Sequence, residues 1–221
     1  MIQTLLFDFD GTLFDTGTGV MRSAQYALER LGAAPLDEAT LRKFVGPPLD
    51  ESFIEFCGFT PERARQAVLL YRERYQPTGI WECEPYPGMP EMLDAVRDAG
   101  FQIAVCTSKP TTMTVRILER YALAEKFDFI CGSELDGTRS KKFEVVQACL
   151  EHFGITDPET VRMIGDRKYD ILGAGKCGVK TIGVSFGYSE PGELEEYGAA
   201  VIADSNEALC ALLLQLRNKT E

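Results

Sequence analysis

The segment TLLFDFDGT, residues 4–12, gives the clearest indication of the fold. Its apolar run, residues 4–9, has the length and hydrophobicity of a strand buried on both faces of a parallel sheet. Asp8 and Asp10 come two residues apart at the end of this run, and Gly11 lets the backbone turn sharply after them. Two carboxylates at the mouth of an apolar strand are costly unless a cation or hydrogen bonds compensate them. The pattern therefore predicts either a functional site or an Asx-type turn with solvated aspartates.

Further short apolar runs alternate with segments of helical periodicity. Because strands that alternate with helices form right-handed parallel βαβ units, we expect an α/β protein with a doubly wound, Rossmann-like parallel sheet. The further strands are expected at residues 101–106, 127–131, 161–164, 180–184 and 200–202. The helices are expected at residues 90–99, 111–122, 142–153, 169–177 and 207–217.

One stretch, residues 16–85, breaks this alternation. It shows four short helical patterns and no strand, and turns rich in glycine and proline separate the helices at residues 32–35, 46–48 and 58–61. We therefore predict an all-helical cap domain, residues 16–85, inserted into an α/β core domain made of residues 1–15 and 86–221. The segment EPYPG, residues 84–88, is expected to be the return hinge.

The composition is that of an ordinary soluble globular protein. Of 221 residues, 45% are hydrophobic and 26% charged, which excludes disordered and fibrous chains. With 34 acidic and 23 basic residues the net charge is −11, so we expect neither nucleic acid nor an anionic membrane as a partner. The N-terminal segment has no basic region, and no apolar run reaches the ~18 residues of a membrane span. We expect a cytoplasmic location.

The cysteines predict neither a disulfide framework nor a zinc site. No CxxC pair occurs, the total is odd, and His152 is the only histidine of the sequence. Buried thiols in a reducing compartment are therefore expected. The seven are Cys57, Cys83, Cys106, Cys131, Cys149, Cys177 and Cys210.

Other strand ends carry groups that bind anions. In open α/β sheets, ligands bind at the carboxyl ends of the strands. Thr107 and Ser108 follow the second expected strand, where a hydroxyl and free backbone amides favour an anion, although simple N-capping explains them equally well. Lys141 and Lys142 open a later helix, which indicates either a bound phosphate or an exposed pair of lysines.

A second pair of carboxylates ends the fourth expected strand. Asp166 stands where that strand stops, and Asp170 lies one helical turn further on the same face. Hard oxygen ligands of this kind suit Mg²⁺, with N-capping as the alternative for Asp166. Together with Asp8 and Asp10, they predict a site that holds a phosphoryl group beside a carboxylate nucleophile.

These motifs, in this order, resemble the four motifs of the haloacid dehalogenase superfamily. They are DFDGT at residues 8–12, Thr107, Lys142 and GDRKYD at residues 165–170. The helical insertion is similar to the cap of the phosphoglycolate phosphatase-like branch. The resemblance covers essentially the whole chain and implies a Mg²⁺-dependent phosphatase with an α/β core and a helical cap.

The resemblance also implies roles for individual residues. Asp8 is similar to the nucleophile that becomes an aspartyl phosphate, and Asp10 to the general acid and base. Thr107 and Lys142 match phosphate-binding positions, with Ser108 as a further candidate beside Thr107. Lys142 is preferred over Lys141 because it stands two residues before Glu144.

The metal ligands implied for Mg²⁺ are Asp8, Asp10 through its main-chain carbonyl, and Asp166, with Asp170 in support. The expected substrate is a small phosphorylated metabolite, either phosphoglycolate-like or nucleotide-like. We expect the loop with Gly46, Pro47 and Pro48 in the cap to line the substrate, unless it is only a turn between helices. A cap helix carries Tyr71, Arg72, Arg74 and Tyr75, which either face the substrate or form a structural stripe.

Other functions remain alternatives. A sugar phosphomutase of this fold carries cations in the cap loop, where this chain has Gly-Pro-Pro-Leu, and a pyrophosphatase shares the same motifs. A dehalogenase would lack Asp10, and a phosphonatase needs a cap lysine, for which Lys43 is the candidate. A non-enzymatic phospho-receiver is disfavoured because it has no inserted helical bundle, and intact motifs argue against a partner-binding pseudo-enzyme. The sequence does not distinguish among the phosphate esters or among oligomeric states.

Overall fold

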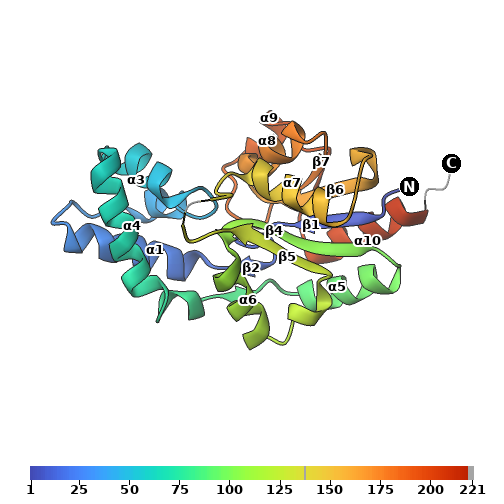
Figure 1. Cartoon of the computed structure of the whole chain (residues 1–221), viewed down its shortest axis with the longest axis horizontal. Coiled ribbons are helices and arrows are strands. Elements are labelled where there is room, and N and C mark those ends of the chain that lie inside the picture. Colours follow the sequence, from blue (N-terminus) through green and yellow to red (C-terminus); the bar gives the residue numbers. More distant parts are fainter. Residues whose placement is uncertain (137, 219–221) are drawn as a thin grey trace. The chain divides into compact units, whose positions relative to one another are not determined.

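A parallel sheet of six strands forms the centre of the computed structural model, which describes residues 1–136 and 138–218 (Figure 1). The strand order is β5-β4-β1-β6-β7-β8, and every adjacent pair is parallel. The expected doubly wound α/β class is confirmed. The strands are β1 (Thr4–Phe7), β4 (Gln102–Pro110), β5 (Phe129–Ser133), β6 (Val161–Gly165), β7 (Lys180–Val184) and β8 (Val201–Ala203).

The central strand β1 determines where the functional edge of the sheet lies. Its four residues are buried, as the apolar run TLLF predicts. Phe7 pairs with Val105 of β4 on one side and with Ile164 of β6 on the other. The order of the strands reverses around β1, so the loops that leave β1, β4 and β6 open at the same edge.

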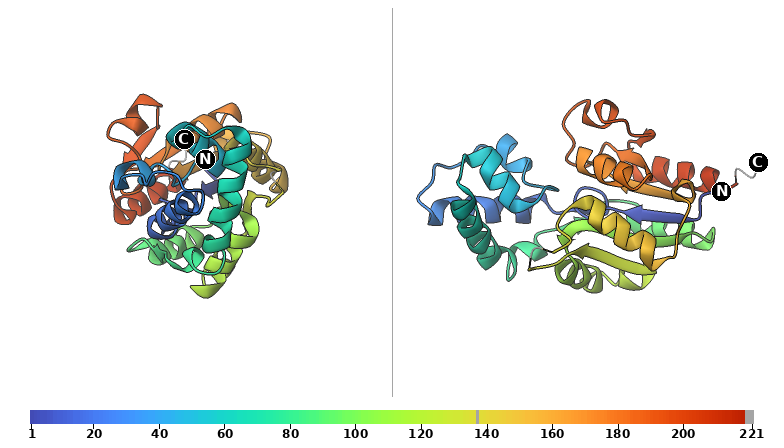
Figure 2. Two further views of the ribbon diagram at one scale, coloured as in Figure 1. Left: turned by 90° about the vertical axis from the view of Figure 1, so that its left-hand side faces the viewer. Right: turned by 45° about the horizontal axis from the view of Figure 1, so that its top comes forward.

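Helices cover both faces of this sheet (Figures 1 and 2). One face carries α7 (Lys142–His152) and α8 (Lys168–Lys176), and the other carries α5 (Met89–Asp98), α6 (Thr111–Arg120) and α10 (Asn206–Asn218). The remaining short helices are α9 (Glu193–Glu196), η2 (Ala124–Lys126) and η3 (Pro158–Thr160). Among the described residues, no helix is long and apolar enough to cross a membrane.

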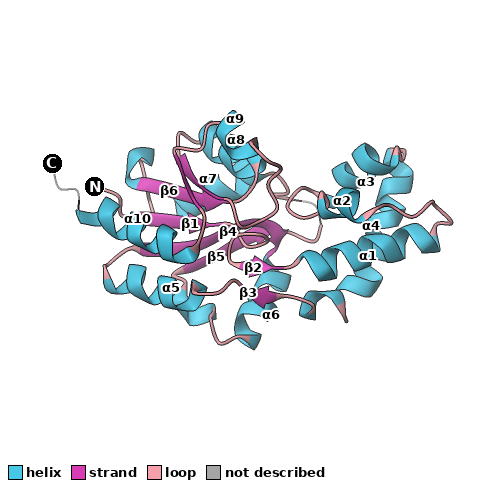
Figure 3. Ribbon diagram, turned by 180° about the vertical axis from the view of Figure 1, so that it is seen from behind, coloured by secondary structure: helices cyan, strands magenta, loops and turns pink. Residues whose placement is uncertain are grey.

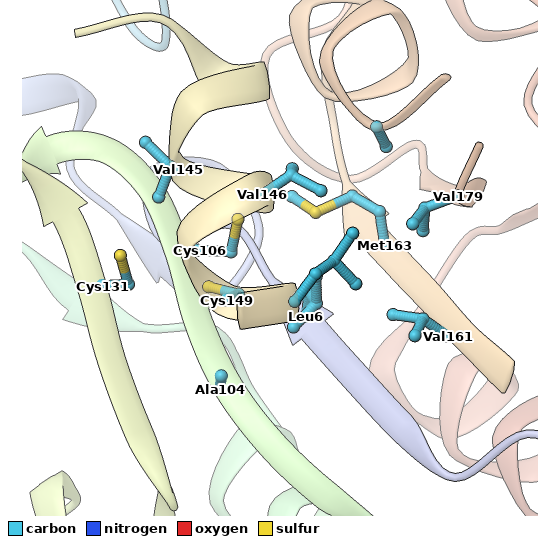
Figure 4. Close-up of a cluster of buried hydrophobic side chains, with 12 residues drawn as sticks. Leu6, Ala104, Cys106, Cys131, Val145, Val146, Cys149, Val161, Met163 and Val179 are labelled. Carbon is cyan, nitrogen blue, oxygen red and sulfur yellow. The ribbon is translucent and has the colours of Figure 1, made fainter. Parts of the chain in front are cut away.

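The core between the sheet and α7 is rich in sulfur (Figure 4). Cys106 from β4, Cys131 from β5 and Cys149 from α7 lie in one cluster with Leu6 and Met163. All seven cysteines are free thiols, and four of them, including these three, are buried. The expectation of mostly buried thiols is confirmed.

The chain divides into two compact units, one formed by Met1–Phe14 with the chain from Pro85 onward and one formed by Asp15–Glu84. From Gly17 to Trp81 the second unit contains only helices and their connections (blue to teal in Figure 2). Local signals explain its helix ends, since Thr60 accepts a hydrogen bond from the amide of Arg63 and Gly58 ends a helix at a φ of 64°. The helices are α1 (Gly17–Arg30), α2 (Glu38–Arg42), α3 (Leu49–Cys57), α4 (Pro61–Tyr75) and η1 (Gly79–Trp81). The role of residues 16–85 as a cap stays a prediction.

Three details differ from the sequence predictions. First, two short strands, β2 (Phe14–Asp15) and β3 (Glu84–Pro85), pair with each other near the ends of the insertion, where no strand was expected (Figure 3). Second, β1 stops at Phe7, because the amides of Leu13 and Phe14 both donate to the Phe9 carbonyl and curl the chain.

The third difference concerns β4, which runs on to Pro110 instead of ending at Cys106. The polar residues after Cys106 look like a strand end in the sequence, but the residue before a proline avoids helical backbone and so stays extended. The pairing of β4 with β5 becomes irregular between Cys106 and Pro110. Lys109 therefore lies in the extended carboxyl-terminal end of β4.

We expect Leu6→Ala to destabilise the protein by about 2–5 kcal/mol, because it leaves a cavity in the buried cluster that also contains Met163. The matched control is Leu172→Ala on α8, where the leucine is 48% exposed and the change should stay within about 0.5 kcal/mol. Urea unfolding of both variants measures the difference. Equal losses would contradict this description of the core.

Candidate active site

Four aspartates gather at the carboxyl edge of the sheet, on the loops after β1 and β6 and in the first turn of α8. Asp8 is 4% exposed, Asp10 9%, Asp166 0% and Asp170 1%. The amide of Asp8 donates to the carbonyl of Ile164, which continues the pairing of β1 with β6 by one residue. Burial of this much negative charge requires compensation within the site.

Lys142 supplies the main compensating charge. It is the first residue of α7, and its Nζ lies 2.8 Å from Asp8 Oδ1 and 2.7 Å from Asp170 Oδ1. The same nitrogen donates a hydrogen bond to the carbonyl of Cys106. Burial alone lowers the pKa of Lys142, but the carboxylates of Asp170 and Asp8 raise it above its usual value. Lys141 is exposed, so the structure brings Lys142 into this site.

Asp8, Asp166 and Asp170 form a group of three whose oxygens lie within 4.8 Å of one another. These three carboxylates and the ammonium of Lys142, which contacts Asp8 and Asp170, sum to a net charge of −2 when all are ionised. Within the described part of the chain, the buried Oδ1 of Asp166 has no hydrogen-bond partner. A charge of this sign, an unsatisfied oxygen and an all-oxygen donor set fit a hard divalent cation.

The same crowding shifts the pKa values of the carboxyl groups. Burial, followed by the charge of Asp170, raises the pKa of Asp8 to about 7, although Lys142 acts in the opposite direction. Burial and the charges of Asp170 and Asp8 also raise the pKa of Asp166. Without a cation, Asp8 therefore retains a proton up to a pH near 7.

Asp10 belongs to a different arrangement. Its Oδ1 lies 2.9 Å from the Nζ of Lys109, and both side chains are largely buried. The carboxylate of Asp10 is not in the group of three, so its expected part as a metal ligand through its main-chain carbonyl stays a prediction. Sequence reasoning missed Lys109 as a site residue, although it directly follows Thr107 and Ser108.

Thr107 and Ser108 lie on the extended end of β4. Thr107 is buried, and its Oγ1 accepts a hydrogen bond from the amide of Lys109. Ser108 is partly buried, and its carbonyl accepts a hydrogen bond from the Ser133 hydroxyl. Both residues lie on the strand next to β1. Their roles in holding phosphate stay predictions.

Backbone from the loop after β7 holds Asp166 in place, which the sequence did not reveal. The amide of Tyr188 donates to Asp166 Oδ2 at 2.7 Å. A Cβ at Gly187 would overlap the carbonyl of Gly11 and the side chain of Asp166, and a Cβ at Gly11 would overlap Asp166 as well. Two glycines therefore allow the backbone to close around this carboxylate.

A buried ion pair anchors the start of α8. Arg167 Nε donates to Glu193 Oε1 at 3.0 Å, and the amide of Lys168 donates to the same oxygen. Burial alone would raise the pKa of Glu193, but the Lys168 amide and the Arg167 guanidinium lower it below its usual value. Asp170 accepts a hydrogen bond from the amide of Arg167, so capping of the helix also orients a site carboxylate.

The helical unit holds the remaining candidates. Gly46, Pro47 and Pro48 lie between α2 and α3, with Pro47 buried and Pro48 capping α3. Their contact with substrate stays a prediction.

The stripe of Tyr71, Arg72, Arg74 and Tyr75 lies on α4. Tyr71 and Tyr75 are buried and stack with a centroid distance of 5.2 Å. Arg74 donates to Ser23 and Glu82 within the same unit. Contacts within the helical unit account for these three side chains, and a part in substrate binding stays a prediction.

Comparison with known proteins gives consistent matches. A family model described as "Haloacid dehalogenase-like hydrolase" matches residues 5–184. The chain is 44% identical over 193 residues to a 5'-nucleotidase from Pseudomonas aeruginosa, covering 87% of each protein. It is 33% identical over 201 residues to tyrosine-protein kinase PtkA from Mycobacterium tuberculosis, covering 90% of this chain and 68% of the kinase.

Two further matches concern the branch and the fold. A phosphoglycolate phosphatase from Agrobacterium fabrum is 31% identical over 219 residues, covering 97% of this chain and 94% of that protein. The crystal structure of a "predicted phosphatase" from Clostridium acetobutylicum has a TM-score of 0.93 and 39% identity, covering 97% of this chain and 99% of that chain. The resemblance to the superfamily and its phosphoglycolate phosphatase-like branch is confirmed.

We expect the metal-free protein to lose stability as the pH rises, because Asp8 must then carry a buried charge. Its pKa is 3.8 in an ordinary setting and about 7 in the folded chain, so its contribution is fully present below the first value and is lost as the pH passes the second. Asp8→Asn should stabilise the metal-free protein by roughly 1–3 kcal/mol at pH 8 and by much less at pH 5. Urea unfolding with a chelator measures both gains, and equal gains would contradict the assigned shift.

Gly187→Ala should destabilise the protein by about 1–3 kcal/mol, because the new Cβ forces either Gly11 or Asp166 to move. The matched control is Gly175→Ala on α8, where a Cβ meets no atom within 4 Å. That change should be neutral or slightly stabilising, since alanine favours a helix. Urea unfolding compares the two variants, and a harmless Gly187→Ala would refute the close packing.

Proposed function

Because the chain belongs to the haloacid dehalogenase-like hydrolase family and is a phosphatase, we propose that it hydrolyses a small phosphate monoester through an aspartyl phosphate on Asp8. The observation that carries the proposal is the separation of two carboxylates that leave the same strand. Asp8 lies beside Lys142 within the group of three, whereas Asp10 is held by Lys109. These two environments support the assignment of Asp8 as the nucleophile and of Asp10 as the group that transfers the proton.

We propose Mg²⁺ as the cofactor. Asp8, Asp166 and Asp170 would hold it, together with the main-chain carbonyl of Asp10. The unsatisfied Oδ1 of Asp166 and the net negative charge of the group support this assignment. When bound, Mg²⁺ offsets the repulsion between the phosphoryl oxygens and the carboxylates.

In the first step, an oxygen of Asp8 attacks phosphorus while the bond from phosphorus to the ester oxygen breaks. Asp10 donates a proton to the departing oxygen. Lys142, Thr107 and Ser108 would bind the other phosphoryl oxygens and hold the group in line for attack. The alcohol leaves, and the phosphoryl group remains on Asp8.

In the second step, Asp10 takes a proton from water, and the water oxygen attacks the same phosphorus. The bond from phosphorus to Asp8 breaks, inorganic phosphate leaves, and the Asp8 carboxylate is restored. Asp10 ends protonated, ready for the next ester. Each proton that Asp10 gives in the first step is therefore returned in the second.

A nucleoside 5'-monophosphate is the leading substrate candidate, because the 5'-nucleotidase has the highest identity among the relatives described above. Phosphoglycolate is the second candidate, and the loop with Gly46, Pro47 and Pro48 would contact the leaving group. We place the enzyme in the cytoplasm, since seven free thiols suit a reducing compartment. A sugar phosphomutase or pyrophosphatase activity would be revealed by the same substrate panel.

We expect phosphate release from at least one of nucleoside 5'-monophosphates, phosphoglycolate, sugar phosphates and pyrophosphate, in the presence of Mg²⁺ and not of chelator. Asp8→Asn should lower kcat by at least about 10³-fold, because no other group forms the covalent intermediate. The exposed Asp98→Asn serves as the matched control and should retain activity. The proposal would be overturned if none of these compounds released phosphate, or if the Asp8→Asn variant kept its activity.

A further inference from the structure

The site contains two lysines, and each forms ion pairs with different carboxylates. Lys142 lies against Asp8 and Asp170. Lys109 approaches Asp10, with an Nζ to Oδ1 distance of 2.9 Å and with side chains that are 5% and 12% exposed. Asp10 is the most exposed of the four site aspartates, so its environment is the one a leaving group and water would reach most easily.

The position of Lys109 is fixed by packing on several sides. Its amide donates to the Thr107 hydroxyl, and a Cβ at Gly132 on β5 would overlap its carbonyl, so the two backbones are in close contact. The ammonium lies 5.8 Å from the centroid of the Phe9 ring, which is fully buried and stacks on Phe14. The Lys109 side chain is 5% exposed, so its ammonium is enclosed beside Asp10 and Phe9.

We propose that Lys109 is a positioning residue that holds one oxygen of Asp10, so that the other oxygen is directed to the leaving group. The inference rests on the proposed function, because it assigns Lys109 a part in the same proton transfer. Lys109 binds Asp10 Oδ1, which leaves Oδ2 to give the proton in the first step and to take it from water in the second. Lys109 itself exchanges no proton with the substrate.

A purely structural ion pair would behave differently. Replacing one partner of such a pair weakens folding and lowers activity toward every substrate alike. A residue that positions a general acid matters most when the leaving group needs a proton. An alcohol leaves poorly without one, whereas a nitrophenolate departs as a stable anion, so the two kinds of ester separate the two explanations.

The experiment compares kcat/KM for two esters, the best alkyl ester of the panel and p-nitrophenyl phosphate. The ratio kcat/KM is used because it reports the step in which the leaving group departs. The variants are Lys109→Met, Lys109→Arg and the control Lys180→Met, which removes a lysine from an exposed ion pair with Glu159. Thermal unfolding verifies that each variant is folded.

We expect Lys109→Met to lower kcat/KM for the alkyl ester by about 10–100-fold and for p-nitrophenyl phosphate by less than about 3-fold, as a part of the general-acid contribution is lost. Lys109→Arg should recover part of the loss, since it keeps a cation beside Asp10. Lys180→Met should leave both values unchanged. Equal losses for both esters in Lys109→Met would overturn the inference.

A double-mutant cycle provides a second measurement. In the Asp10→Asn background, Lys109→Met no longer leaves a buried carboxylate without a partner. Asp10→Asn should show the same preference for p-nitrophenyl phosphate, and adding Lys109→Met to it should change neither value further, because Lys109 acts through Asp10. Additive losses would overturn the inference. If the unaltered chain hydrolyses neither ester, the proposed function fails and this inference fails with it, an outcome distinct from equal losses in an active enzyme.

Discussion

The close approach of Lys142 to Asp8 and Asp170 is the interaction on which the rest of the site depends. A carboxylate at the end of a fully buried strand is unfavourable, and Asp8 is only 4% exposed to solvent. One ammonium group at the start of α7 compensates two carboxylates that come from β1 and α8. The helix, the strand and the carbonyl of Cys106 are thereby tied to one nitrogen atom.

Lys142 does not neutralise all of the buried negative charge, and this excess charge affects the other groups of the site. Lys142 contacts only two of the three grouped carboxylates, and burial together with their mutual repulsion raises the pKa of Asp8 and Asp166. The backbone of the β7 loop then has to hold Asp166 against repulsion from its neighbours, which explains the close contact at Gly187. Lys109 supplies a separate positive charge beside Asp10.

Much of this could be predicted from the sequence. The apolar runs located all six strands of the sheet, and the two pairs of aspartates and Lys142 marked the edge that carries the site. The contacts that depend on tertiary packing could not be predicted. The ion pair of Lys109 could not be predicted because its partner Asp10 is 99 positions away in the sequence. The close contact of Gly187 could not be predicted because its loop carries no recognisable motif. The short pairing of β2 with β3 was missed because two residues are too few to show a period.

The sulfur-rich core links the position of Lys142 to the volume of the side chains packed beneath it. Cys106 contributes its thiol to the packed cluster and its carbonyl to Lys142, so one residue belongs to both. A larger side chain at Cys106 or Cys149 would press on the same stretch of β4 that fixes the lysine. Small, weakly polar side chains fill this cluster, so the volume of these buried thiols bears on the position of Lys142.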